Sequence, residues 1–427
     1  MHREDDDVAA ARRRVRALRS SSVSATRPAP GAPTVAVFGV EGRVGLTIAR
    51  ALGRHRVPCF GVSLEGVTYG CRSRHLAGFA ALTAANPADG VDQAIAVFRR
   101  VQPDFVMAAS EPVMRELNRR RRDIGAALLF PEQDVLDGAF DKSRTVAAAR
   151  AIGIPTPRTH DAQALLDGAP PADLAFPVVL KPPQPYSTPP WQQHNFRYRY
   201  AHSLDQVRHL LAPFRDAPYL PLVQEYCPGQ GVGVELCMHE GEAVAAFQHE
   251  RLREIPLTGG VSVMRRSVPL HPGMLGDAVR LLRALRWRGV AMVEYRHDPA
   301  SGRYWCVEVN GRFWGSLCLP VRCGVNFPYL LLQTMGLGRA PQTRLGAYPT
   351  GVYCRWLSAD LGWLRAALTT RRQDLPEHLR VPKIALIGRF LRDFVRLPYH
   401  DIEWPDDPLP ALHFWKDRLR RGCFAAA

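Results

Sequence analysis

The sequence predicts a multidomain protein of mixed α/β and α+β class, and three observations lead to that prediction. The chain has 427 residues, which is more than one hydrophobic core usually organises. Its N-terminal part alternates short apolar runs with helical stretches, as parallel α/β domains do. Its middle part contains pairs of strand-like runs joined by short polar turns, a pattern typical of hairpins. We therefore expect a parallel domain first and an α+β unit after it.

Composition indicates an ordinary globular protein. Hydrophobic residues make up 46% and charged residues 22% of the chain, which argues against a disordered or fibrous class. No apolar run approaches the roughly 20 residues that cross a bilayer, and the first residues lack the apolar centre of a secretory signal. The nine cysteines include no Cys-x-x-Cys pair. We expect a soluble protein of the reducing cytoplasm with no membrane partner.

The formal net charge of +16 raises the question of a nucleic-acid partner, since clustered basic residues bind phosphates. Only four of the 56 basic residues are lysines, however, so the arginine excess indicates a coding bias. Basic runs such as 119–122 are typical of solvated faces. We expect no nucleic-acid partner and keep a non-catalytic nucleic-acid-binding protein as an alternative.

Breaks in the hydrophobic pattern divide the chain into segments. Residues 1–32 show no sustained period and are expected to form a disordered tail. Residues 33–131 open with a strand, a glycine-rich turn and a helix, and predict a parallel α/β domain. A helix over 137–152 starts the next unit, and residues 341–427 are helical and basic up to Asp401 and irregular afterwards. Further strands are expected over 176–181, 222–226, 232–238, 243–248, 290–296 and 303–310, with a helix over 274–285.

The predicted hairpin at 290–310 gathers polar side chains on one face. Alternation along its second strand places Glu308, Asn310 and Arg312 on the same side. The opposite side then takes the apolar residues of that strand, namely Trp305, Val307 and Val309. Three polar groups therefore share one surface.

The same hairpin predicts that two carboxylates face each other. If pairing is symmetric about Ser301, Glu294 lies directly opposite Glu308. Like charges so placed destabilise a sheet unless a cation lies between them. The oxygen atoms of Glu294, Glu308 and Asn310 suit Mg²⁺, which usually shares its ligand shell with substrate phosphates. The alternative is a solvated edge hairpin with unrelated acids.

Lysine is so rare here that each position is informative. Lys181 ends a predicted strand, and Lys142 begins a predicted helix after Asp141. Both positions suit a compact charge aimed at phosphate oxygens, although a surface ammonium is the simpler interpretation of either lysine alone. The P-loop pattern G-x-x-x-x-G-K-[ST] is absent, so a nucleotide site must be built differently.

Three glycines follow the first strand. Gly39, Gly42 and Gly45, with Glu65 twenty residues further on, have a spacing that resembles a dinucleotide-binding turn. A reductase of the short-chain type needs a Tyr-x-x-x-Lys pair, and the chain contains none. We interpret the glycines as a tight turn with close helix packing, and an NAD(P)-dependent oxidoreductase stays as an alternative.

Two further segments are candidates for ligand contacts. Residues 224–227 leave a strand into a turn, where backbone groups suit the polar edge of an adenine. The loop 258–262 lies in the arginine-rich segment 251–266 and suits an anionic substrate group. The alternative, which fits the segment equally well, is a plain surface loop. The candidate substrate residues are Arg253, Thr258, Gly259, Gly260 and Ser262.

In combination these segments resemble the ATP-grasp superfamily, over roughly residues 33–340. The resemblance rests on these motifs in order: Asp141-Lys142, Gly153-Ile154-Pro155-Thr156-Pro157, Val178-Val179-Leu180-Lys181-Pro182, Gln224-Glu225-Tyr226, Glu294 and Glu308-Val309-Asn310-Gly311-Arg312. They are most similar to the carboxylate-amine ligase branch, which is related to the ATP-binding fold of carbamoyl-phosphate synthase. This resemblance implies a Rossmann-like domain over 33–131 and ATP-grasp lobes over 132–222 and 223–340. The helical extension over 341–427 lies outside the resemblance and is expected from the sequence pattern alone.

The resemblance also implies a role for each candidate residue. Lys142 and Lys181 would hold the α and β phosphates of ATP, and Arg312 the transferred γ-phosphoryl group, so that Lys181 and Arg312 act in catalysis. The implied adenine contacts are Gln224, Glu225, Tyr226 and Cys227, and the implied ligands of Mg²⁺, or Mn²⁺ in its place, are Glu294, Glu308 and Asn310. The implied reaction joins a small-molecule carboxylate to an amine through an acyl phosphate and releases ADP and phosphate.

Two segments depart from the pattern of that family. The loop at 182–187 is proline-rich where many relatives are glycine-rich. Gly231 stands where many relatives carry a ribose-binding carboxylate, for which Gln230 or Glu235 is a candidate substitute. The sequence leaves open the carboxylate, the amine and the oligomeric state, a homodimer included.

Overall fold

The protein is described from a computed structural model that covers residues 23–25, 33–183, 196, 198–339, 341–375, 379–396 and 398–421. These residues form sheets of six, four and eight strands. Within the tail expected over 1–32, residues 23–25 form strand β1 (Val23–Ala25), which pairs antiparallel with β4 (Gly78–Ala81). The other tail residues and the proline-rich loop from 184 onward lie outside the described residues. No helix of the described part is long and apolar enough to span a membrane.

The first sheet has the parallel arrangement expected for 33–131. Its strand order is β1-β4-β3-β2-β5-β6, and β2 to β6 are mutually parallel, as in doubly wound domains. A side chain at Gly45 would overlap the Gly39 carbonyl group, so the glycine turn allows close packing. The remaining elements are β2 (Val35–Phe38), α2 (Arg43–Gly53), β3 (Cys59–Ser63), α3 (Pro87–Val101), β5 (Phe105–Ala108), α4 (Glu111–Arg119) and β6 (Ala127–Leu128).

The second sheet belongs to a small lobe and has the order β7-β10-β8-β9. The single helix expected over 137–152 is two helices, because Asp141 is extended and its carboxylate caps the second helix through the Ser143 and Arg144 backbone N–H groups. The elements are α5 (Gln133–Phe140), α6 (Lys142–Ala151), β7 (Thr159–His160), α7 (Ala162–Asp167), β8 (Val178–Lys181), β9 (Arg199–Ala201), α8 (Leu204–Leu211) and β10 (Leu222–Glu225).

The third sheet is the largest and contains both predicted hairpins. Its order is β15-β14-β11-β12-β13-β17-β18, with β16 paired to β12. Val232, Val234 and Leu236 share a core with α9, so the alternate residues of β11 face the other side. The elements are β11 (Gln230–His239), β12 (Glu242–Ile255), β13 (Val261–Ser267), α9 (Pro272–Ala284), β14 (Gly289–Asp298), β15 (Arg303–Asn310), α10 (Cys318–Arg322), α11 (Phe327–Leu331), β16 (Arg344–Leu345) and β17 (Tyr353–Arg355).

A β-bulge decides how the second hairpin pairs. On the turn side of the bulge Tyr295 faces Cys306, so the pairing there is centred between Ala300 and Ser301 instead of on Ser301. The register then shifts, and beyond the shift Glu294 faces Glu308. The predicted carboxylate pair is confirmed, but the symmetric register behind it holds only beyond the bulge.

Because of the bulge, the faces predicted for the residues of β15 on the turn side of it are wrong. Strict alternation puts Trp305 and Val307 on the side of Val309. In the structure Cys306 shares the core with Val309, because the bulge reverses the alternation between them. The Val307 side chain is only partly buried.

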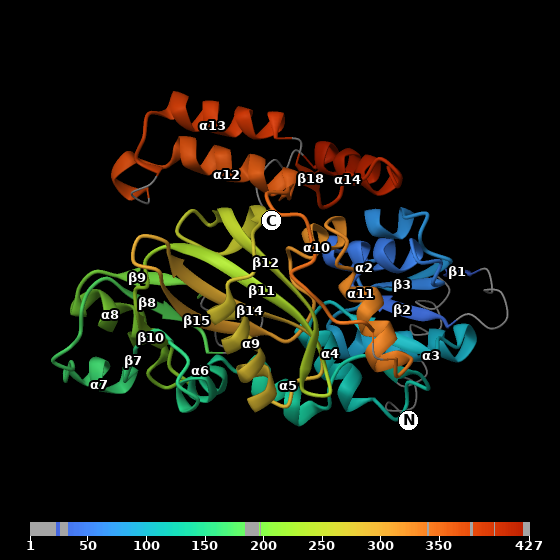
Figure 1. Cartoon of the computed structure of the whole chain (residues 1–427), viewed down its shortest axis with the longest axis horizontal. Helices are drawn as coiled ribbons and strands as arrows, with labels where there is room; N and C mark the ends of the chain where they lie inside the picture. The colour runs from blue at the N-terminus through green and yellow to red at the C-terminus, as the bar shows by residue number, and fades with distance from the viewer. Residues whose placement is uncertain are drawn as a thin grey trace, which may run out of the picture.

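The C-terminal extension covers the large sheet. Figure 1 shows α12 (Leu357–Thr369) and α13 (Lys383–Val395) layered above that sheet, and α14 (Leu409–Arg420) beside the first domain. Strand β18 (Tyr399–His400) leads into α14. The irregular end predicted after Asp401 is wrong, because Pro408 and Pro410 lie at the start of α14, where a missing N–H group costs no helical hydrogen bond.

The segment before α14 joins the domains through buried ion pairs. The Asp401 carboxylate accepts hydrogen bonds from Arg43 at 2.6 Å and from Arg265 at 3.1 Å. Asp407 binds Arg50 of α2 at 2.8 Å. Asp401 thus connects the first domain, the large sheet and the extension.

We predict that Asp401→Asn lowers the free energy of unfolding by about 3–5 kcal/mol, because it leaves two buried guanidinium groups without their carboxylate. The matched control is Asp406→Asn, whose partner Arg54 is 36% exposed and whose own side chain is 37% exposed. The control should cost about 1 kcal/mol or less. Urea denaturation of both variants tests this, and equal midpoints would contradict it.

Candidate active site

Two carboxylates and an amide meet at one edge of the large sheet. Glu294 on β14 and Glu308 on β15 are cross-strand neighbours. Asn310 Nδ2 donates to Glu294 Oε1 at 2.8 Å and to Glu308 Oε1 at 3.3 Å. The two glutamate side chains are only 16% and 13% exposed, so water screens their repulsion poorly.

Cations from separate segments compensate the two acids. Lys142 Nζ, at the start of α6, lies 3.3 Å from Glu308 Oε2. A terminal nitrogen of Arg251, on β12, lies 2.5 Å from Glu294 Oε1. Each carboxylate therefore has its own cationic partner.

Lys181 adds a third positive group. Its side chain is buried at the end of β8, and Nζ donates to the Val307 carbonyl at 3.4 Å. Burial lowers the pKa of Lys181 to about 8. Burial by itself raises the pKa of Glu308, but Lys142 and Lys181 outweigh it and hold that pKa at about 2. Glu308 is therefore an anion at neutral pH.

Arg312 lies on the same surface, as the sequence predicts. Its guanidinium donates to Asn310 Oδ1 at 3.0 Å and to Glu111 Oε1 at 3.1 Å. Glu111 begins α4 in the first domain and was not predicted as a site residue. Its position just after β5 is the available signal, since ligands of parallel sheets bind beyond the carboxyl ends of the strands.

We call these residues the charged cluster: Lys142, Lys181, Arg251, Glu294, Glu308, Asn310 and Arg312. Its donor set fits a divalent cation, because two carboxylates and one amide converge. Their present partners are cationic groups, amide N–H groups and, for Glu308, the Tyr198 hydroxyl at 3.3 Å. Turning the Asn310 amide over would present its oxygen to the same space.

The predicted adenine segment lies at the far end of the small lobe's central strands. Leu222 pairs with Lys181 and Glu225 with Val178, so three residues, roughly 10 Å at the rise of a strand, separate the ends. The Gln224 amide donates to Thr159 at 2.9 Å. In the remaining predicted positions, Glu225 accepts from Arg158, Tyr226 is exposed and Cys227 is buried.

The ribose candidate Glu235 is excluded by its position. It is completely buried, accepts from the Ser316 hydroxyl at 3.0 Å, and lies 2.9 Å from His249 Nδ1. Its carboxylate therefore belongs to the interior of the large sheet.

The prediction that Arg253 contacts a substrate is corrected. Its guanidinium binds Asp360 at 2.6 and 2.7 Å and also Asp393, so it anchors α12 and α13. Irregularities in β12 on both sides of Arg253 change the face on which it lies. Arg251, two residues earlier, is the residue that reaches the cluster.

The loop 258–262 lies beside Arg251. Arg251 donates to the Gly260 carbonyl at 3.3 Å, and the Thr258 carbonyl accepts from the Tyr200 hydroxyl at 2.5 Å. Gly259 follows Thr258, and Ser262 is buried in β13. The loop is thus near the cluster, while its contact with a substrate stays a prediction.

The glycine turn of the first domain is used for packing. Arg43, one residue after Gly42, stacks over Trp356 at 4.4 Å and binds Asp401. It also donates to the Gly315 carbonyl. Protein groups therefore contact the first residue of α2, where a dinucleotide phosphate would bind. This favours the packing interpretation of the glycines over a nicotinamide site.

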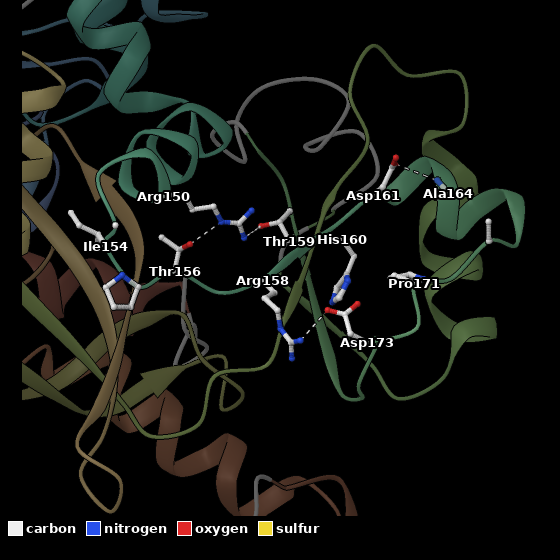
Figure 2. A pocket seen from close by; sticks show the side chains of 13 residues that line it. Arg150, Ile154, Thr156, Arg158, Thr159, His160, Asp161, Ala164, Pro171 and Asp173 are labelled. Atoms are coloured by element: carbon white, nitrogen blue, oxygen red, sulfur yellow. Dashed lines mark hydrogen bonds and ion pairs between the residues drawn. The ribbon is translucent and has the colours of Figure 1, made fainter.

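A cavity of about 660 Å³ lies beside β7 and is lined by none of the charged cluster. Figure 2 shows its two arginines bound to other residues of the lining: Arg150 binds Thr156 and Thr159, and Arg158 binds Asp173 at 3.0 Å. The cavity is therefore separate from the charged cluster, but it adjoins the predicted adenine segment, because Thr159 and Arg158 of its lining bind Gln224 and Glu225.

The sequence and the fold of this protein are similar to those of known proteins. A family model described as "ATP-grasp in the biosynthetic pathway with Ter operon" matches residues 219–358. An L-amino acid ligase structure from Bacillus licheniformis is 15% identical, with a TM-score of 0.56 over 71% of this chain and 74% of its own. The biotin carboxylase domain of Hydrogenobacter thermophilus 2-oxoglutarate carboxylase, solved with MgADP and bicarbonate, is 13% identical, with a TM-score of 0.57 over 75% and 73%. No curated protein matches significantly.

We predict that Arg253→Gln destabilises the protein by about 3 kcal/mol, the lower end of the cost of breaking a buried ion pair. Asp360 and Asp393 lose one partner each, but Asp360 keeps Arg355 at 2.6 Å and Asp393 keeps Arg396 at 3.0 Å. Its effect should be on folding, measured by urea denaturation. Mn²⁺ binding by the folded fraction should match the wild type. A stable variant with altered Mn²⁺ binding, tighter or weaker, would place Arg253 in the site.

Proposed function

We propose that the chain is an ATP-dependent ligase of the ATP-grasp superfamily that joins a carboxylate to an amine. An ATP-grasp family model matches residues 219–358, and solved ligase and carboxylase structures have a similar fold. The observation that carries the proposal is the charged cluster. Paired acids, two lysines and a site arginine are the groups that phosphoryl transfer requires, because the reaction spreads negative charge over phosphate oxygens.

The residues divide between nucleotide and metal. Glu294, Glu308 and Asn310 would hold Mg²⁺, which when bound neutralises phosphate oxygens. Lys142 and Lys181 would bind the α and β phosphates, since both belong to the lobe that carries segment 224–227. The Lys142 ammonium lies 3.3 Å from Glu308, and the Lys181 ammonium donates to the carbonyl of the preceding residue, Val307. The backbone of 224–227 would hold the adenine, because Gln224 and Glu225 already use their side chains within the protein.

Arg312 would stabilise the transferred phosphoryl group. Glu111 and Asn310 hold its guanidinium beside the paired acids, so its charge is oriented before substrate arrives. A carboxylate oxygen attacks the γ-phosphorus and ADP leaves. An amine then attacks the acyl carbon of this acyl phosphate, the nitrogen loses a proton, and phosphate leaves as the amide forms.

The structural neighbours support the substrate class. One is named as a ligase of L-amino acids, and another was solved with MgADP and a bicarbonate anion. We therefore propose small carboxylates and amines, amino acids among them, as substrates.

We predict that the purified protein forms hydroxamates from hydroxylamine, MgATP and a pool of L-amino acids, with release of ADP. Glu308→Gln should lower this rate about 100-fold or more, because it removes one of the two carboxylates that would hold Mg²⁺, the ion that neutralises phosphate oxygens. Glu240→Gln, on the exposed β11–β12 turn, is the matched control and should keep full activity. Equal activity in Glu308→Gln and the wild type would sink the assignment, and removal of Mg²⁺ by chelation should abolish the signal.

A further inference from the structure

Arg251 occupies an unusual position in the charged cluster. It binds Glu294 at 2.5 Å and Glu254 at 3.1 Å, and it donates to the Gly260 carbonyl at 3.3 Å. Its Nε is buried and has no hydrogen-bond partner within the described part of the chain. A buried guanidinium with an unused donor has capacity for one more acceptor.

The backbone around Arg251 gives its side chain a fixed path. A methyl group at Gly231 would lie 3.0 Å from Arg251 Cδ, so the missing side chain makes room for it. The Gly260 carbonyl holds its far end beside the loop 258–262. The guanidinium is thus positioned between the paired acids and that loop.

A divalent cation and Arg251 compete for one carboxylate. Glu294 is the ion-pair partner of Arg251, and under the proposed function it would also be one of the oxygen donors to the metal ion. When a cation takes Glu294, the buried guanidinium loses part of its compensation, and an unpaired buried charge is costly. A new anion beside Arg251 would restore the balance.

We infer that Arg251 binds the carboxylate substrate, and that in the unliganded protein its guanidinium is the counter-ion of Glu294. The inference rests on the proposed function and names its carboxylate-binding residue. Arginine suits this role because its planar donors match a carboxylate oxygen pair. Arg312, already bound to Glu111 and Asn310, serves the phosphoryl group instead.

Two measurements on Arg251→Gln test the inference. Calorimetric titration with Mn²⁺ alone should show about 5- to 10-fold tighter binding than in the wild type, because the competing charge is gone. The pooled amino-acid concentration that half-saturates hydroxamate formation should rise at least about 30-fold, while the maximal rate changes less. If Arg251 had only a structural role, the variant would bind both Mn²⁺ and the amino-acid substrates more weakly.

Arg251→Lys separates charge from geometry and guards against a folding defect. It should keep Mn²⁺ affinity within about 2-fold of the wild type and still raise the half-saturating concentration about 10-fold, since an ammonium lacks the planar fork. Arg283→Gln, which removes an exposed ion pair with Glu242, should change neither quantity. Weaker Mn²⁺ binding in Arg251→Gln, or an unchanged half-saturating concentration in both Arg251 variants, would overturn the inference.

The two proposals fail differently. If the wild type forms no hydroxamate while Mn²⁺ binding still tightens in Arg251→Gln, the competition between Arg251 and the cation for Glu294 is supported. The proposed ligase activity, and with it the carboxylate-binding role of Arg251, is then refuted. If the wild type is active and Arg251→Gln has wild-type half-saturation, the ligase stands and the role of Arg251 falls.

Discussion

The structure places two carboxylates directly opposite each other on neighbouring strands, and this repulsion has to be compensated within the protein. Lys142 compensates Glu308 from a helix of the small lobe, and Arg251 compensates Glu294 from within the large sheet. The acid pair therefore depends on groups that only the tertiary structure brings together. Under the proposed function, a divalent cation binds the two carboxylates. Lys142 then binds nucleotide phosphates, and Arg251 binds a substrate carboxylate.

Arginine rather than lysine stabilises the junction between the domains. Arg50 is completely buried and donates to the Asp407 carboxylate and to the carbonyls of Asp401, Ile402 and Asp407. Arg265 is equally buried and binds Asp401. A lysine has one nitrogen where these sites use several divergent donors. The arginine excess is thus more than a coding bias, because the interior requires part of it.

The paired acids were predictable because a hairpin turn and strand alternation are local features. Glu294 and Glu308 face each other as expected, although a bulge supplies the final register. The same kind of irregularity separates Arg253 from the cluster, since the breaks in β12 place Arg253 and Arg251 on different faces, although residues two apart in a regular strand share one. A bulge depends on how neighbouring strands fit, and no motif in the segment announces it.

The sequence by itself determined the classes of element, the lysines at a strand end and a helix start, and the acids of the hairpin, because each depends on residues close in the chain. Only the tertiary structure decided that Glu111 holds Arg312, that Arg251 pairs with Glu294, and that Asp401 joins three segments. Those contacts join residues far apart in sequence. Their geometry follows from how whole sheets and domains pack, which no local pattern encodes.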